Sequence, residues 1–256
     1  MKIETYPPTP SPEVEGEKNR NIKNKATAGL GWSTLISMLV SLFMVFEWVP
    51  TEEDQGIVQR IFYFHVPCAW VAFAAFGIVA IAGVFYLWLK DQIWDDLGYA
   101  AAEIGMVFCT LVLITGSIWA KPIWGTWWTW DSRLTTTFIL WLLYGGYLML
   151  RAMADDTPEV ARFGAVIGIV AALDVPVVIL SVRLWRTIHP AVLVTRAGEH
   201  GLEDPRMVIT LLVSLAAFTV LFGWLLMLRF QQLRTRSRLF TIRREVALIE
   251  AAAQDY

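Results

Sequence analysis

Residues 61–89 read IFYFHVPCAWVAFAAFGIVAIAGVFYLWL, a run that contains no Lys, Arg, Asp or Glu. A helix needs about 20 mostly apolar residues to cross the hydrocarbon core of a bilayer. This run is longer than that. It therefore predicts a transmembrane helix that is tilted or that projects beyond the bilayer.

The rest of the chain repeats this pattern. Five further apolar runs lie at about 28–49, 98–118, 134–150, 160–182 and 207–228. Only 17% of the residues are charged, against about 25% in soluble domains, and the mean hydropathy is +0.52. We therefore predict an all-α integral membrane protein whose six transmembrane helices form one domain over residues 28–228. The polar residues 1–27 are interpreted as a disordered tail, and residues 229–256 as a basic C-terminal tail.

The distribution of Lys and Arg predicts the orientation of these spans. The two termini and the even-numbered loops carry 14 of the 21 Lys and Arg residues, and the odd-numbered loops carry 7. The more basic side of a membrane protein faces the cytoplasm. Both termini are therefore expected in the cytoplasm, and in a bacterium the odd-numbered loops would face the periplasm.

The chain has only three histidines, and this orientation places all of them outside. His65 lies near the outer end of the second span, His189 just past the outer end of the fifth, and His200 further along the same loop. The loop between the third and fourth spans is also outside. It contains WGTWWTWDSRL at residues 124–134, so the histidines and the tryptophan cluster are expected on one face of the membrane.

Helical spacing suggests how these side chains are grouped. If the fifth helix continues outward, Ser181, Leu184, Trp185 and His189 share one apolar face, and Arg183 points elsewhere. Three tryptophans of the loop, Trp124, Trp127 and Trp128, also have the spacing of one helix face. Asp131 or Ser132 suits the N-cap of the fourth span.

Two histidines, an aromatic surface and several cations together describe a possible haem site. Neutral imidazole is a common axial ligand of haem iron, indole faces can lie against a porphyrin, and Arg or Lys can pair with propionates. An ordinary interfacial belt of tryptophan is the alternative. A belt spreads over several helix ends, however, whereas five of the 13 tryptophans fall within residues 119–130.

Other features narrow the function. Glu103 and Asp174 lie within the predicted spans and are interpreted as structural, although an acidic residue in the membrane is a functional candidate by default. The chain has no GxxxxGK[ST] motif for nucleotide hydrolysis and no CxxCH motif of a c-type cytochrome. Its net charge of -2 gives no indication of nucleic-acid binding.

Three segments resemble the haem exporter protein C family of the cytochrome c maturation system, whose Trp-rich loop is often called the WWD motif. They are RIFYFHVPCAW (60–70), TGSIWAKPIWGTWWTWDSRLT (115–135) and SVRLWRTIH (181–189). The resemblance implies that His65 and His189 are axial ligands of a transiently bound haem b. It further implies a haem-binding platform of Trp119, Trp124, Trp127, Trp128, Trp130 and Asp131, with Arg133 as a propionate partner. Trp185 is expected beside His189 on the apolar face.

The resemblance also implies a role. Proteins of this family handle haem at the outer face of the bacterial inner membrane and pass it to a periplasmic haem chaperone. They are not enzymes themselves. They work in an ABC-type complex with a separate ATPase subunit, a second membrane subunit and a small single-span subunit.

Three other classes of protein stay open on the residues alone. A b-type electron-transfer cytochrome would retain its haem between facing histidines within the bundle. The haem-handling synthase of the other cytochrome c assembly pathway shares a Trp-rich loop but would be expected to bring further histidines or spans. A permease-like transporter subunit with a plain aromatic belt would bind no haem.

Overall fold

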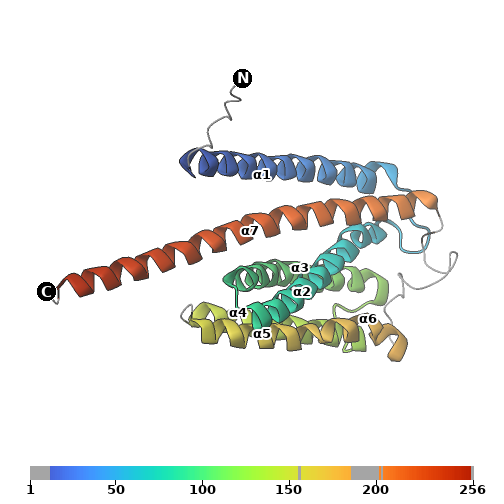
Figure 1. The fold of residues 1–256 in the computed structure, drawn as a ribbon. Helices are drawn as coiled ribbons and strands as arrows, with labels where there is room; N and C mark the ends of the chain where they lie inside the picture. Colours follow the sequence, from blue (N-terminus) through green and yellow to red (C-terminus); the bar gives the residue numbers. More distant parts are fainter. Residues whose placement is uncertain (1–11, 155–156, 186–201, 203, 255–256) are drawn as a thin grey trace, which may run out of the picture.

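The structure is a computed structural model, which describes residues 12–154, 157–185, 202 and 204–254. Seven α-helices dominate it (Figure 1). They are α1 (Pro12–Phe43), α2 (Phe62–Leu89), α3 (Gln92–Trp124), α4 (Ser132–Met153), α5 (Pro158–Ala172), α6 (Asp174–Leu184) and α7 (Pro205–Gln254). A π-helical turn, Met44–Trp48, ends α1, and a 3-10 turn, Ile57–Ile61, precedes α2.

Six helical segments are long and apolar enough to cross a membrane, as predicted. They cover 25–48, 57–89, 92–124, 132–153, 158–184 and 205–239. The fifth is built from α5 and α6, which are separated at Leu173. Each segment extends beyond the apolar run that predicted it, because helices continue past the hydrocarbon core until a capping residue ends them.

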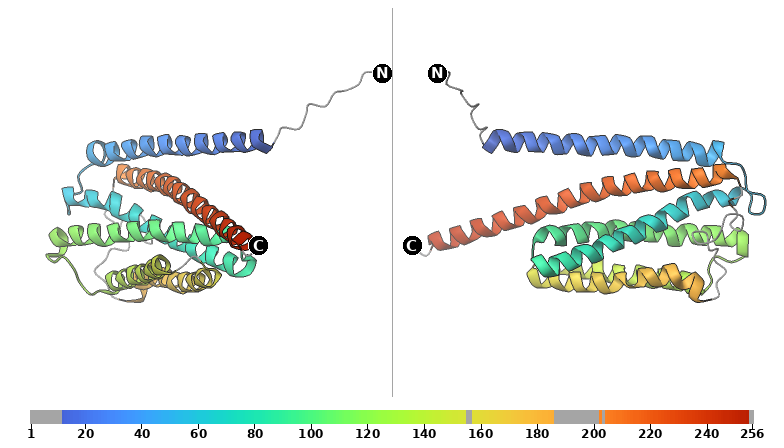
Figure 2. Two further views of the ribbon diagram at one scale, coloured as in Figure 1. Left: turned by 90° about the vertical axis from the view of Figure 1, so that its left-hand side faces the viewer. Right: turned by 45° about the vertical axis from the view of Figure 1, so that its right-hand side comes forward.

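The first and last helices of the chain, α1 and α7, are longer than the sequence indicated. We expected a disordered tail over residues 1–27, but α1 begins at Pro12, so residues 12–27 are helical. Proline suits the first position of a helix. At the other terminus, α7 runs through the basic segment to Gln254 and projects beyond the other helices (Figures 1 and 2). Continuity with a membrane span supplies the nucleus that an isolated helix of this composition lacks.

The helices lie in layers, with α2 crossing obliquely between α7 and α5 (Figure 2). Its most extensive packing is with α3, to which it is joined by a tight turn at Lys90. In the core, the rings of Phe76 and Tyr144 stack at a centroid distance of 3.7 Å. A Cβ added at Gly105 would lie 2.7 Å from the Phe76 ring, and one at Gly168 would lie 2.7 Å from Val79. Small residues therefore set how closely α3 and α5 approach α2, as is common between membrane helices.

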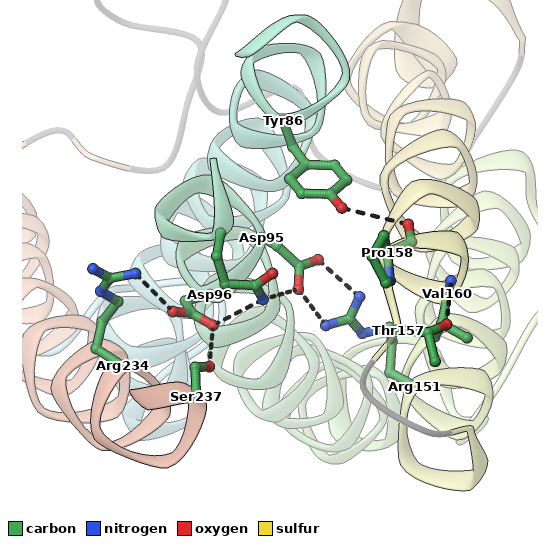
Figure 3. Close-up of polar contacts among 10 residues, drawn as sticks. Tyr86, Asp95, Asp96, Arg151, Thr157, Pro158, Val160, Arg234 and Ser237 are labelled. Atoms are coloured by element: carbon green, nitrogen blue, oxygen red, sulfur yellow. Dashed lines mark hydrogen bonds and ion pairs between the residues drawn. The ribbon is translucent and has the colours of Figure 1, made fainter. Parts of the chain in front are cut away.

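The end of the bundle that carries the α2–α3 turn is held by ion pairs between helices (Figure 3). Arg151 of α4 makes two 2.7 Å hydrogen bonds to Asp95 of α3, and both side chains are buried. The neighbouring Asp96 accepts a 2.9 Å hydrogen bond from Ser237 of α7 and pairs with Arg234. These contacts attach the start of α3 to the end of α4 and to the C-terminal part of α7.

Glu103, which we interpreted from the sequence as structural, also joins two helices. Arg229 of α7 binds both of its carboxylate oxygens, at 2.5 and 2.7 Å. This supports the structural interpretation of Glu103. Asp174 begins α6, and its Oδ2 is buried with no hydrogen-bond partner among the described residues.

Candidate functional site

A cavity of about 670 Å³ opens at the end of the bundle opposite these ion pairs. Its volume lies within the range of roughly 300–1,000 Å³ usual for small-molecule and cofactor sites. Five helices contribute to its wall, together with the loop after α3. Most of the wall is apolar, and beside the hydroxyls of Ser117, Thr137 and Thr219 it presents one imidazole, four indoles and two arginines. Those side chains are His65, Trp70, Trp119, Trp124, Trp128, Arg133 and Arg183.

His65 lies in the first turn of α2 and is only 7% exposed. Its Nδ1 is 2.9 Å from Oγ1 of Thr115 on α3. One residue further along α3, Gly116 leaves room for the ring, because a Cβ there would lie 3.1 Å from Cε1 of His65. The imidazole therefore packs closely against α3 at Gly116, and a larger residue at this position would displace the ring.

Trp119 forms the deepest part of the aromatic wall and is 7% exposed. Its ring meets the edges of two neighbours, His65 at 5.9 Å and Phe62 at 6.0 Å between centroids. Its Nε1 donates a 3.0 Å hydrogen bond to Oε1 of Gln55, in the loop before α2. Trp119 is thus a fixed surface beside the imidazole.

The loop tryptophans do not share a helix face, so that part of the spacing argument is wrong. Gly125 adopts a left-handed conformation with φ of 75° and caps α3 immediately after Trp124. Glycine is the usual residue at this position because it has no Cβ to clash. Trp127 and Trp128 therefore lie on irregular backbone, where the i, i+3, i+4 rule does not apply.

The tryptophans form two groups, and the division between them does not follow the end of α3. Trp119, Trp124 and Trp128 line the cavity. Trp127 and Trp130 lie outside it, with exposed fractions of 58% and 74%. Nε1 of Trp128 is buried and has no hydrogen-bond acceptor in the described part of the chain.

Asp131 is the N-cap of α4, as predicted. Its Oδ1 accepts hydrogen bonds from the backbone N–H groups of Arg133, at 2.9 Å, and Leu134, at 3.0 Å. The cap begins α4 so that its first turn faces the cavity, and Arg133 lines the wall there. Asp131 thus positions the wall without lining it.

The prediction for the end of the fifth span was partly wrong. The helix ends at Leu184, and Trp185 has extended backbone with φ of -127° and ψ of 156°. Trp185 is 52% exposed and does not line the cavity. Arg183, which we expected to point elsewhere, lines it instead. Periodicity predicts which residues share a face only while the helix continues, and no Gly or Pro marks this helix end in the sequence.

The predicted ligand His189 and the third histidine, His200, were both expected in the loop after the fifth span. His189 and His200 lie outside the described residues. Besides Arg183, the sequence interpretation missed Thr115 and Gly116. Both belong to TGSIW, the first five residues of the segment 115–135. A Thr-Gly pair inside an apolar helix could have indicated a close polar contact there.

The cavity residues fit a flat, largely apolar molecule that carries negative charge. The indoles provide apolar faces and the imidazole a nitrogen ligand for a metal. The two arginines can bind carboxylates. Fold and site together define a multi-pass membrane protein with a cofactor-sized aromatic cavity at one end of its helix bundle.

Comparison with known proteins narrows this class to one family. The sequence model of the family described as heme exporter protein C matches residues 14–245. A heme exporter protein C from Bradyrhizobium diazoefficiens is 38% identical over 193 residues, which cover 75% of this chain and 73% of that protein. Those from Haemophilus influenzae and Escherichia coli K12 are 33% and 32% identical, over 86% and 80% of this chain and 89% and 82% of theirs. The chain therefore belongs to the heme exporter protein C family.

Proposed function

We propose that this protein binds haem b in the cavity and delivers it for cytochrome c maturation. The observation that carries the proposal is the meeting of His65, four indoles and two arginines in one cavity of cofactor size. Membership of the heme exporter protein C family supports the same cargo. The haem is a transported substrate, so the site must hold it firmly but reversibly.

In this proposal, His65 and His189 are the axial ligands of the haem iron. Neutral imidazole binds haem iron through one nitrogen, while the other nitrogen hydrogen-bonds to the protein. His65 has such a second contact, with Thr115. The arrangement predicts that the haem lies with a face toward Trp119, Trp124 and Trp128.

The arginines would hold the haem propionates. Arg133 begins α4 and Arg183 ends α6, so the two cations approach the cavity from different helices. Guanidinium groups bind carboxylates through paired hydrogen bonds. This would orient the haem and leave its opposite edge accessible for transfer.

Transfer would be to a periplasmic haem chaperone, with the cavity end of the bundle facing the periplasm. Trp127 and Trp130 are exposed beside the cavity, where a docking partner can reach them. We further propose that the protein acts as a subunit of an ABC-type complex in the bacterial inner membrane. ATP would be hydrolysed by a separate subunit, and a second membrane subunit and a small single-span subunit would complete the assembly. The helical extension of α7 would then lie in the cytoplasm.

Absorption spectra of the purified protein in detergent test the ligand assignment. His65→Ala and His189→Ala should each weaken or abolish the haem Soret band. His200→Ala is the matched control and should leave the band unchanged. Wild-type spectra from both ligand variants would exclude these histidines as axial ligands.

Delivery is tested by co-purification with the chaperone in cells that make haem. A haem-dependent complex that disappears in His65→Ala supports delivery. A permanent electron-transfer cytochrome would instead retain its haem, cycle reversibly between redox states and form no such complex.

A further inference from the structure

We propose that Thr115 is a positioning residue that fixes the tautomer of His65. On this view its hydroxyl oxygen holds the proton of the imidazole at Nδ1, so that the lone pair lies at Nε2 and can ligate haem iron. The consequence for haem ligation rests on the proposed function. The tautomer itself is a property of the haem-free protein.

The proposal begins with the single hydrogen of the Thr115 hydroxyl. Oγ1 of Thr115 donates to the backbone carbonyl of Leu111, one turn earlier in α3, at 2.7 Å. The same oxygen lies 2.9 Å from Nδ1 of His65. Because a hydroxyl has one hydrogen and two lone pairs, Oγ1 presents a lone pair to the imidazole. Nδ1 must then carry a hydrogen and donate it.

The alternative arrangement gives up the hydrogen bond between Thr115 and the Leu111 carbonyl. If the hydroxyl turned to donate to Nδ1, the contact with the Leu111 carbonyl would lose its hydrogen. A net hydrogen bond favours a state by about twofold to twelvefold. The Leu111 carbonyl lies inside a helical segment that is apolar enough to span a membrane, where water cannot easily replace the lost bond. The tautomer protonated at Nδ1 is therefore the favoured one.

Two neighbours hold the ring in the position that this hydrogen bond requires. Gly116 lets Cε1 of His65 approach α3, where a Cβ would lie at 3.1 Å. Trp119 packs against the ring from the side, at an interplanar angle of 64°. The imidazole therefore cannot turn over to exchange its nitrogens without moving one of these residues.

The consequence for haem binding follows from the chemistry of imidazole ligands. Iron binds the nitrogen that carries the lone pair, and an acceptor for the opposite N–H both fixes the ring and raises the basicity of the ligand. Loss of such an acceptor typically reduces metal affinity by about 10- to 100-fold. A less basic ligand also favours ferric iron less, so the midpoint potential should rise.

The tautomer can be measured without haem. The chain has three histidines, so the haem-free protein with ¹⁵N-labelled histidine gives three sets of ring signals, and His65→Gln identifies one of them. In the wild type and in Thr115→Ser, Nδ1 of His65 should be the protonated nitrogen. In Thr115→Val, which keeps the shape but has no oxygen, this preference should disappear.

Thr110→Val is the matched control. Thr110 lies on the same helix, donates to the Met106 carbonyl at 2.8 Å and accepts a hydrogen bond from Trp141, also at 2.8 Å. This variant removes the same oxygen from the same pattern but leaves His65 untouched. It should retain the wild-type tautomer, and it also shows whether a Thr-to-Val change in α3 disturbs folding.

Haem titration and redox potentiometry complete the test. Thr115→Val should bind haem about 10- to 100-fold more weakly and have a higher midpoint potential, while Thr115→Ser and Thr110→Val stay close to wild type. His65 protonated mainly at Nε2 in the wild type, or Thr115→Val equal to Thr110→Val in tautomer and potential, would overturn the inference. A wild-type protein that binds no haem would overturn the proposed function instead, because the tautomer measurement needs no haem.

Discussion

Nε1 of Trp119 donates a 3.0 Å hydrogen bond to Oε1 of Gln55, a residue 64 positions earlier in the chain. Gln55 lies in a short loop closed by a 3.0 Å hydrogen bond from the Gly56 N–H to the Glu52 carbonyl. Gly56 makes that turn with φ of 62°. This contact ties the loop before α2 to the aromatic wall of the cavity. The loop thus supports a tryptophan that itself packs against His65.

Replacing Gln55 with Leu should loosen that wall. The buried indole N–H would lose its acceptor, which costs about 1–3 kcal/mol, so Trp119 should become mobile and haem occupancy should fall severalfold. The haem-to-protein ratio of the purified variant measures this effect. Glu53→Gln changes an exposed side chain of the same loop and should retain wild-type occupancy. Equal occupancy in both variants would mean that Gln55 does not support the cavity.

Gly116→Ala should displace His65. The added methyl would lie 3.1 Å from Cε1 of the imidazole, so the ring must move away from Thr115. We expect weaker haem binding and an altered Soret maximum with little loss of helix content. In Gly146→Ala, on α4, the new methyl meets nothing within 4 Å. That control should bind haem normally and gain about 0.5–1 kcal/mol in stability from helix propensity.

Trp128→Ala and Trp127→Ala should separate haem binding from haem transfer. Trp128 lines the cavity, whereas Trp127 is 58% exposed outside it. The first variant should lose haem during purification. The second should retain haem but co-purify less of the periplasmic chaperone. The reverse pattern would contradict the assignment of Trp128 to the cavity wall and of Trp127 to the exposed surface.

The buried ion pair at the other end of the bundle should affect stability without affecting the site. Arg151→Met leaves the carboxylate of Asp95 buried and without its guanidinium partner, which typically costs about 3–5 kcal/mol. Thermal unfolding in detergent should show a clear loss, and the remaining folded protein should still bind haem. The double variant Asp95→Leu, Arg151→Met removes both charges and should recover most of the loss.

The control for this prediction is the exposed pair between Arg206 and Asp204, whose N–O distance is also 2.7 Å. Exposed pairs are screened by water and contribute little, so Arg206→Met should leave the unfolding temperature unchanged. A similar loss in both arginine variants would show that burial of the Asp95 pair is not the cause.

Several features could be predicted because they depend on neighbouring residues in the chain. The six spans follow from the length of apolar runs, since a bilayer requires about 20 such residues in each helix. Asp131 was predicted as an N-cap because a carboxylate just before an apolar run can accept hydrogen bonds from the first free N–H groups. His65 and the tryptophan loop were expected on one side because two spans lie between them, and an even number of crossings returns the chain to the same side of the membrane.

Other features involve helix ends, which spacing alone does not reveal. The face shared by Trp124, Trp127 and Trp128 required a helix that Gly125 ends. Trp185 was expected on a helix that stops one residue earlier. In both cases the periodic pattern in the sequence continues past the residue at which the helix ends. Only the first of these helix ends is marked in the sequence, by Gly125.

By itself, then, the sequence determined the class of protein, the number of membrane spans and the residue types that gather at one end. These depend on hydrophobic length and local capping, which act within a few turns of one segment. Only the tertiary structure decided which side chains enter the cavity, that Arg183 joins Arg133 there, and that Thr115 and Gln55 hold His65 and Trp119. Those contacts join residues 50 or more positions apart, and they form only when the packing of α2 against α3 brings the two segments together.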